Sequence, residues 1–129
     1  MIVEYWDYIV RDDLHKNPDK VFLFGDNLDG RGYGGQAGEM RGESNALGIP
    51  TLKGDPSKWG TDGYFSDDEF EENKKRIRQA FDIIPKGRVV VVPSMGLGTG
   101  AAQLERRAPR TYAYLLKCIE DLENDEDFE

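Results

Sequence analysis

Two glycine-rich segments hold the residues of this chain that are best suited to bind a ligand. The first, FLFGDNLDGRGYGGQAGEM, covers residues 22–40, and the second, VVVVPSMGLGTGAA, covers residues 89–102. In each, a short apolar run leads into the glycines. Glycine accepts positive φ and lets a ligand approach the main chain closely, so consecutive amides can converge on an anion. The two turns together predict a site for a phosphorylated ligand.

The backbone of both turns and a few polar side chains would form this site. A helix beginning after Gly35 would direct its positive end at the same charge. Arg31 could neutralise phosphate or simply face solvent. The residues expected to contact the ligand are Asn27, Gly30, Arg31, Gly32, Gly34, Gly35 and Gln36 in the first segment, and Ser94, Met95, Gly96, Leu97, Gly98, Thr99 and Gly100 in the second.

Three neighbouring polar residues are candidates for catalysis. Asn27 can hydrogen-bond a ligand hydroxyl through its carbonyl and its amide group, whereas Asp26 and Asn27 together could equally form a simple turn. Asp26 or Asp29 could act as a general base if it held a water molecule near the ligand. For each carboxylate, a solvated side chain is the alternative interpretation.

Several other chemistries are excluded by spacing or by residue counts. Both turns satisfy variants of G-x-G-x-x-G, but neither has the strand-helix-strand surroundings of a dinucleotide-binding fold. Neither turn continues into the Gly-Lys-Ser/Thr of a P-loop, and Ser94 lacks the flanking glycines of a nucleophile elbow. One cysteine, Cys118, and one histidine, His15, cannot build a structural zinc site. We therefore expect no metal and no cofactor, a packed thiol at Cys118 and a surface position for His15.

Composition indicates one domain followed by an acidic end. The chain has 129 residues and a net charge of -8, and residues 120–129 hold seven of its acidic side chains and no basic one. This division predicts a domain over residues 1–119 and a solvated tail over residues 120–129, which could hold a protein partner. The nearly neutral body makes nucleic acid an unfavourable partner. No apolar run has membrane-spanning length, so we expect a cytoplasmic protein.

Apolar runs and turn residues predict the elements that position the two turns. Strands are expected at 2–6, 21–24, 47–52 and 89–92. Helices are expected before Pro18, from Gln36 to Arg41, from Ser66, where Ser66 and Glu69 have capping-box spacing, and from Pro109 onward. Residues 53–65 form a loop whose aromatic residues either cover a ligand or anchor the loop. The alternation predicts a compact three-layer α/β domain with a central mixed sheet flanked by helices.

The glycine segments also resemble the ligand loops of macro domains, the α/β modules that bind ADP-ribose. Asn27 and Leu28 before the first glycines look like the first loop, and Pro93 before Gly98, Thr99 and Gly100 looks like the diphosphate loop. The chain is similar to small, divergent bacterial or phage members of that family. The resemblance implies a cleft for ADP-ribose or a related nucleotide diphosphate, with Asp7 at the position of the adenine-contacting aspartate.

The resemblance leaves the activity open. Hydrolysis of an ADP-ribosyl linkage is one implied activity, although neither catalytic pattern of the family carries over to the corresponding positions, among them Gln36 and Gly100. Peripheral strands of the family are also missing. The alternatives are a non-catalytic adaptor that binds a protein through the acidic tail or the aromatic loop, and a hydrolase of another nucleotide signal.

Overall fold

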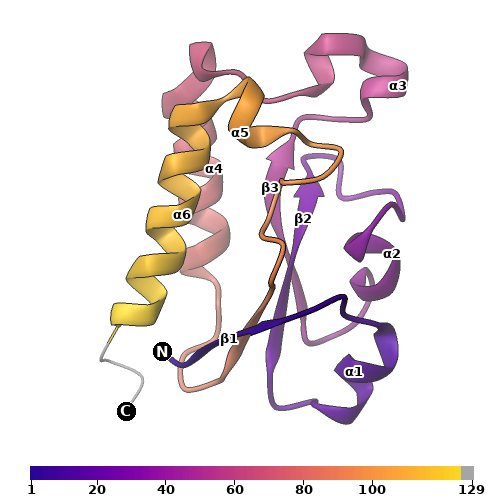
Figure 1. The fold of residues 1–129 in the computed structure, drawn as a ribbon, viewed down its shortest axis with the longest axis vertical. Coiled ribbons are helices and arrows are strands. Elements are labelled where there is room, and N and C mark those ends of the chain that lie inside the picture. Colours follow the sequence, from indigo (N-terminus) through magenta and orange to yellow (C-terminus); the bar gives the residue numbers. More distant parts are fainter. Residues whose placement is uncertain (126–129) are drawn as a thin grey trace.

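Four strands form a central sheet with helices on both faces (Figure 1). The computed structural model describes residues 1–125 of the chain. Its elements in chain order are β1 (Val3–Trp6), α1 (Arg11–Lys16), β2 (Val21–Asn27), α2 (Gln36–Met40), β3 (Ala46–Leu52), α3 (Pro56–Trp59), η1 (Gly60–Gly63), η2 (Asp67–Glu69), α4 (Phe70–Asp82), β4 (Val90–Pro93), α5 (Leu104–Arg107) and α6 (Pro109–Asn124).

The strands lie in the order β1-β4-β2-β3, and all three neighbouring pairs run parallel. The α/β class and the flanking helices are confirmed. The mixed sheet is replaced by a parallel one, because each strand returns to the sheet through a helical crossover and enters it in the same direction. Within residues 1–125, antiparallel pairing is confined to one isolated bridge between Leu52 and Tyr64.

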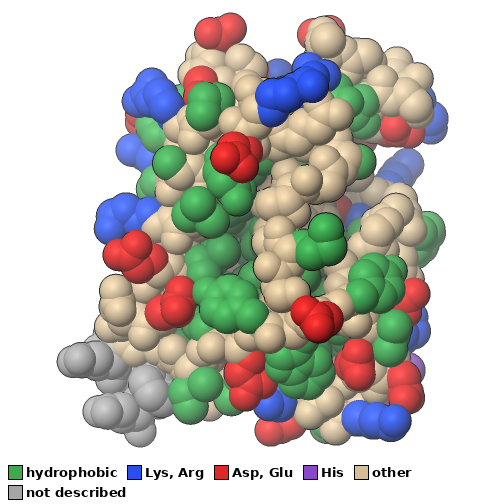
Figure 2. Space-filling view, viewed as in Figure 1, with side chains coloured by type: hydrophobic (Ala, Val, Ile, Leu, Met, Phe, Trp, Pro, Cys, Tyr) green, Lys and Arg blue, Asp and Glu red, His purple; other side chains and the backbone are tan. Residues whose placement is uncertain are grey.

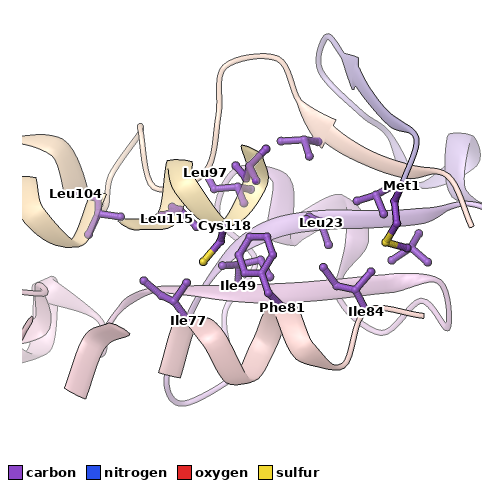
Figure 3. Packing of buried hydrophobic residues seen from close by; sticks show 14 of the residues in the cluster. Met1, Leu23, Ile49, Ile77, Phe81, Ile84, Leu97, Leu104, Leu115 and Cys118 are labelled. Carbon is purple, nitrogen blue, oxygen red and sulfur yellow. The ribbon is translucent and has the colours of Figure 1, made fainter. Parts of the chain in front are cut away.

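The alternation of side chains along β2 explains the two helical layers. Phe22 and Phe24 pack with residues of α1 and α2, whereas Val21 and Leu23 belong to the larger core beneath α4 and α6. All four side chains are buried, which confirms that this continuous apolar run is a strand covered on both faces. Figure 3 shows part of the larger core, where Leu23 and Ile49 of the sheet lie near Phe81 of α4 and Cys118 of α6.

The direction of the crossovers places a crevice between β4 and β2. The chain moves across the sheet from β1 to β3 with α1 and α2 on one face, then returns to β4 through α4 on the other face, as right-handed crossovers require. The segments that leave the neighbouring strands β2 and β4 therefore depart to opposite faces. Open parallel sheets bind ligands at such a point, beyond the carboxyl ends of the strands. Both glycine turns begin there.

The segment 53–65 is more ordered than the expected loop, since it contains α3 and η1. Phe65 is buried, and the guanidinium of Arg107 lies 3.7 Å from the ring centroid of Tyr64. These two aromatic residues anchor the segment to the body of the domain. Trp59 is exposed over 60% of its surface.

The beginning of the helical stretch after Ser66 differs in detail from its sequence prediction. The Ser66 hydroxyl accepts a hydrogen bond from the Asp68 amide at 3.2 Å and caps η2, ahead of α4. Glu69, the expected partner in a capping box, forms an ion pair with Lys53 instead. At the other end of the chain, α6 continues to Asn124, into the stretch expected to be a tail. Residues 126–129 of that expected tail lie outside the described residues.

Two smaller expectations are confirmed. Cys118 is buried, and its burial raises the pKa of the thiol, as for a packed rather than a nucleophilic cysteine. His15 is exposed and lies 2.8 Å from a carboxylate oxygen of Glu43. In the part of the chain that the structure covers, no helix is long and apolar enough to cross a membrane.

The first turn of α6 is capped by Asp67, a residue far away in the sequence. Its carboxylate accepts hydrogen bonds from the amides of Arg110 and Thr111, at 2.8 and 3.0 Å, and from the Thr111 hydroxyl at 2.9 Å. Asp67→Ala is expected to lower the free energy of unfolding by about 1–2 kcal/mol, because it leaves these donors without their acceptor. Urea denaturation measures the loss, and Asp68→Ala, at an exposed neighbour, is the control.

The same cap predicts how stability depends on pH. Burial opposes ionisation of Asp67, but the hydrogen bonds from Arg110 and Thr111 outweigh it, so the pKa of the carboxyl is lowered in the folded state. The stabilisation is therefore complete above the unfolded pKa of about 3.9 and is lost as the pH falls through the folded value. The stabilities of wild type and Asp67→Ala should converge in acid, and a constant difference down to the lowest pH would contradict this assignment.

Candidate functional site

A cleft of about 610 Å³ lies beyond the carboxyl ends of the strands, between the two glycine turns. This volume is within the range of about 300–1,000 Å³ of pockets that enclose small-molecule ligands. Three segments line most of it: residues 31–37 after β2, residues 54–56 after β3, and residues 93–96 and 98–102 at the end of β4 and beyond. In the space-filling view, the upper centre of this face is largely backbone and uncharged polar surface, with charged side chains around it (Figure 2).

The cleft brings together most of the residues expected from the sequence. Three of them do not line it: Gly30, Asp29 and Leu97, whose side chain packs in the larger core. Asp29 lies instead beside Gly54. The expected residues that do line the cleft are Asp7, Asp26, Asn27, Arg31, Gly32, Gly34, Gly35, Gln36, Ser94, Met95, Gly96, Gly98, Thr99 and Gly100.

The second turn contains consecutive backbone amides that have no hydrogen-bond acceptor among the described residues. Its base is fixed by hydrogen bonds from the Ser94 amide to Trp6 at 2.7 Å and from the Leu104 amide to the Gly98 carbonyl at 3.0 Å. Between these points, the five amides from Gly98 to Ala102 have no acceptor within residues 1–125. The residues that carry them all line the cleft. Amides of this kind can donate to phosphate oxygens.

Arg41 holds the first turn in place. Its guanidinium donates two hydrogen bonds to the Asp26 carboxylate, at 2.5 and 3.2 Å, and others to the carbonyls of Gly32 at 2.7 Å and Arg31 at 3.2 Å. The side chains of Arg41 and Asp26 are both only 15% exposed. The guanidinium also lies 5.5 Å from the ring centroid of Phe24. A single side chain thus joins the end of β2 to the backbone of the turn.

The amide side chains of the first turn act on the backbone. Asn27 donates to the Arg31 carbonyl at 2.7 Å and accepts from the Arg31 amide at 3.3 Å, so its side chain closes the turn. Gln36 likewise pairs with both backbone groups of Ile9, at 2.7 and 2.8 Å. The sequence allowed Asn27 either to bind a ligand hydroxyl or to form a turn. The observed contacts of its side chain are those of the turn.

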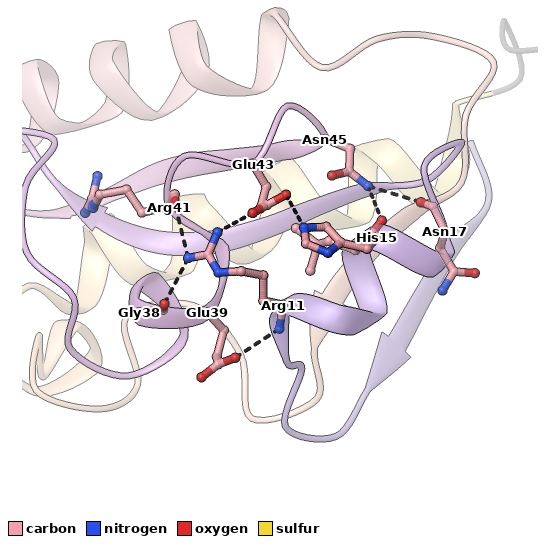
Figure 4. A network of polar contacts seen from close by, with 9 residues as sticks. Arg11, His15, Asn17, Gly38, Glu39, Arg41, Glu43 and Asn45 are labelled. Atoms are coloured by element: carbon pink, nitrogen blue, oxygen red, sulfur yellow. Dashed lines mark hydrogen bonds and ion pairs between the residues drawn. The ribbon is translucent and has the colours of Figure 1, made fainter.

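A polar network behind the first turn fixes α2 against α1 (Figure 4). Arg11 donates to the carbonyls of Gly38 and Arg41, at 3.1 and 3.2 Å, and forms an ion pair with Glu43. Arg11 thereby supplies donors to carbonyls at the end of α2 that a helix leaves unsatisfied. Its hydrogen bond to Glu43, aided by His15, lowers the pKa of the Glu43 carboxyl. Because α2 has five residues, its own dipole adds little to the cleft.

The β1 end of the cleft combines an acceptor with apolar surface. Asp7 accepts a hydrogen bond from the Ser94 hydroxyl at 2.9 Å, which ties β1 to the start of the second turn. Beside it, Tyr8 and Met95 line the cleft and are exposed over 63% and 81% of their surfaces. This end offers apolar side chains and a carboxylate to a ligand.

Several lining residues were not expected from the sequence, among them Arg41, Thr51 and Asp55. Arg41 sits at the end of the expected helix, where nothing in the local pattern indicates a contact with Asp26. Asp55 carries a usable signal, since Asp-Pro-Ser is typical of the first residues of a helix. Within residues 1–125, no group of histidine, cysteine and acidic side chains could hold a metal ion.

Fold and cleft define a parallel α/β domain with a ligand-sized cleft between two strand-end glycine turns. The sequence profile of DUF7831, a family of unknown function, matches residues 4–118, and the chain belongs to this family. No curated protein and no solved structure matches the chain.

Proposed function

We propose that the cleft binds ADP-ribose or a related nucleotide diphosphate. The observation that carries the proposal is the row of five unpaired amides, from Gly98 to Ala102, along a cleft at the crevice between β4 and β2. A diphosphate has the charge and the number of oxygens to accept hydrogen bonds from such a row. Arg31, exposed on the opposite turn, would add a positive charge.

The two ends of the cleft would hold the adenosine and the terminal ribose of the ligand. Tyr8 and Met95 provide an apolar surface for a base next to the Asp7 carboxylate. The end beyond β2 and β3 carries the Thr51 hydroxyl and the Asp55 carboxylate, which suit a sugar. This placement follows the resemblance of the sequence to macro domains. We also propose a cytoplasmic setting, because a single cysteine suits a reducing compartment.

Hydrolysis of an ADP-ribosyl linkage is a further part of the proposal. Of the three candidate catalytic residues, Asp26 is bound by Arg41 and Asn27 closes the turn, while Asp29 lies outside the cleft lining. The Arg41 guanidinium occupies both carboxylate oxygens of Asp26, so they are poorly placed to orient a water molecule. If the protein is a hydrolase, we expect a water held by another group of the cleft to be the nucleophile.

Calorimetric titration with ADP-ribose tests the proposal. We expect saturable binding at one site, with AMP and ribose 5-phosphate at least about 10-fold weaker, a difference of ~1.4 kcal/mol. Each of these controls lacks part of the ligand. Chromatography of ADP-ribosylated peptide after incubation then tests turnover. Absence of binding by all three compounds at millimolar concentration would rule out the proposed ligand class.

A further inference from the structure

The segment after β3 forms a third wall of the cleft, apart from the two glycine turns. Leu52, Gly54, Asp55 and Pro56 line the cleft on this side. The turns offer mainly backbone donors, whereas a sugar hydroxyl is also a donor and needs an acceptor. At the β2 and β3 end, the carboxylate of Asp26 is already bound to Arg41. Asp55 is the carboxylate of this wall.

The Asp55 side chain is oriented by its own local structure. Its Oδ1 accepts hydrogen bonds from the amide and the hydroxyl of Ser57, at 2.9 and 2.8 Å, and so caps α3. These two bonds lower the pKa of the carboxyl, which keeps it ionised near neutral pH. Its Oδ2 has no partner among residues 1–125. Asp55 is thus an exposed, ionised carboxylate on the wall of the cleft, with one oxygen held by Ser57 and the other free of partners among the described residues.

We infer that Asp55 is a ligand-binding residue that accepts a hydrogen bond from a hydroxyl of the terminal sugar of the ligand. The inference rests on the proposed function and assigns a residue to the terminal sugar, the part of ADP-ribose that ADP lacks. With the diphosphate on the amides of the second turn and the base at the β1 end, the terminal sugar lies at the β2 and β3 end, next to Asp55. Preorganisation by Ser57 reduces the entropy lost when the hydroxyl binds.

The test compares ADP-ribose with ADP, which lacks the terminal ribose. Asp55→Ala should lower the affinity for ADP-ribose by about 10-fold or more, which is the effect of one hydrogen bond to a charged group. The affinity for ADP should stay within about 2-fold of wild type. Asp55→Asn keeps an oxygen that can cap α3 but loses the charge, and should show the same selectivity with an unchanged melting temperature. Ser57→Ala removes one capping contact and should retain ADP-ribose binding.

The outcomes separate this inference from the proposed function. If wild type binds ADP-ribose and both Asp55 variants match it, the assignment of Asp55 is overturned while the proposed function stands. Equal weakening of ADP and ADP-ribose would also overturn it, because a contact with the terminal sugar cannot affect ADP. If wild type binds neither ligand, the proposed function itself fails and the assignment falls with it.

Discussion

Arg41→Ala is expected to lower the free energy of unfolding by roughly 3 kcal/mol and to abolish ligand binding. The substitution leaves the poorly exposed Asp26 carboxylate without its ion pair and frees the carbonyls of Arg31 and Gly32. Removing one partner of a buried pair costs about 3–5 kcal/mol, and we take the lower end because the pair is only partly buried. Urea denaturation measures the stability, and titration of ADP-ribose measures binding.

Arg31→Ala is the matched control for this prediction. It also removes an arginine from the cleft, but the Arg31 side chain is exposed, so the free energy of unfolding should change by less than about 0.5 kcal/mol. Arg41→Lys should recover only part of the stability, because an ammonium group cannot span Asp26 and the turn as the planar guanidinium does. If Arg41→Ala had the same free energy of unfolding as wild type, the first turn would not depend on Arg41 for its structure.

Gly98→Val is expected to destabilise the fold by roughly 3–4 kcal/mol. Gly98 has a φ of +73°, and a Cβ placed there would lie 3.1 Å from side-chain atoms of both Thr51 and Leu104. Left-handed backbone costs an L residue about 1–2 kcal/mol, and overpacking adds about 1–3 kcal/mol. Thermal or urea unfolding reports the loss.

Gly100→Val provides the contrast within the same turn. A Cβ on Gly100 would meet no atom within 4 Å, and its φ lies outside the left-handed region. Its stability should change by less than about 1 kcal/mol, while the added side chain occupies the cleft and weakens ADP-ribose binding. If Gly100→Val folded normally and bound ADP-ribose like wild type, the ligand would not lie against this turn.

The layers of the fold could be predicted from the sequence because they depend on local patterns. The apolar runs at 21–24 and 89–92, each followed by turn residues, are sufficient to place β2 and β4, and Pro109 marks the start of α6. The parallel order of the strands could not be read in this way. It depends on which strands pair across the chain, and the local sequence of each strand does not encode its neighbour.

The candidate site was predictable to the same degree. The glycines in the sequence predict turns with accessible backbone amides. The side chains that fix these turns, however, contact residues far away in the sequence. Arg41 reaches Asp26 over 15 residues, and Asp7 accepts a hydrogen bond from Ser94 over 87. A sequence also presents Gly98 and Gly100 as equivalent members of one turn, although only Gly98 packs against Thr51 and Leu104.

The dependence of α2 on Arg11 has a consequence for the order of folding. A helix of five residues is far too short to persist alone, since isolated helices need about 12–15 residues even with favourable sequences. Donors to its last carbonyls come from α1, which must already lie on the sheet. The wall of the cleft formed by the first glycine turn and α2 should therefore form late. Its amide hydrogens should exchange with solvent through local openings that need less free energy than global unfolding. A peptide of residues 21–42 would contain every residue of that wall and would still lack its shape.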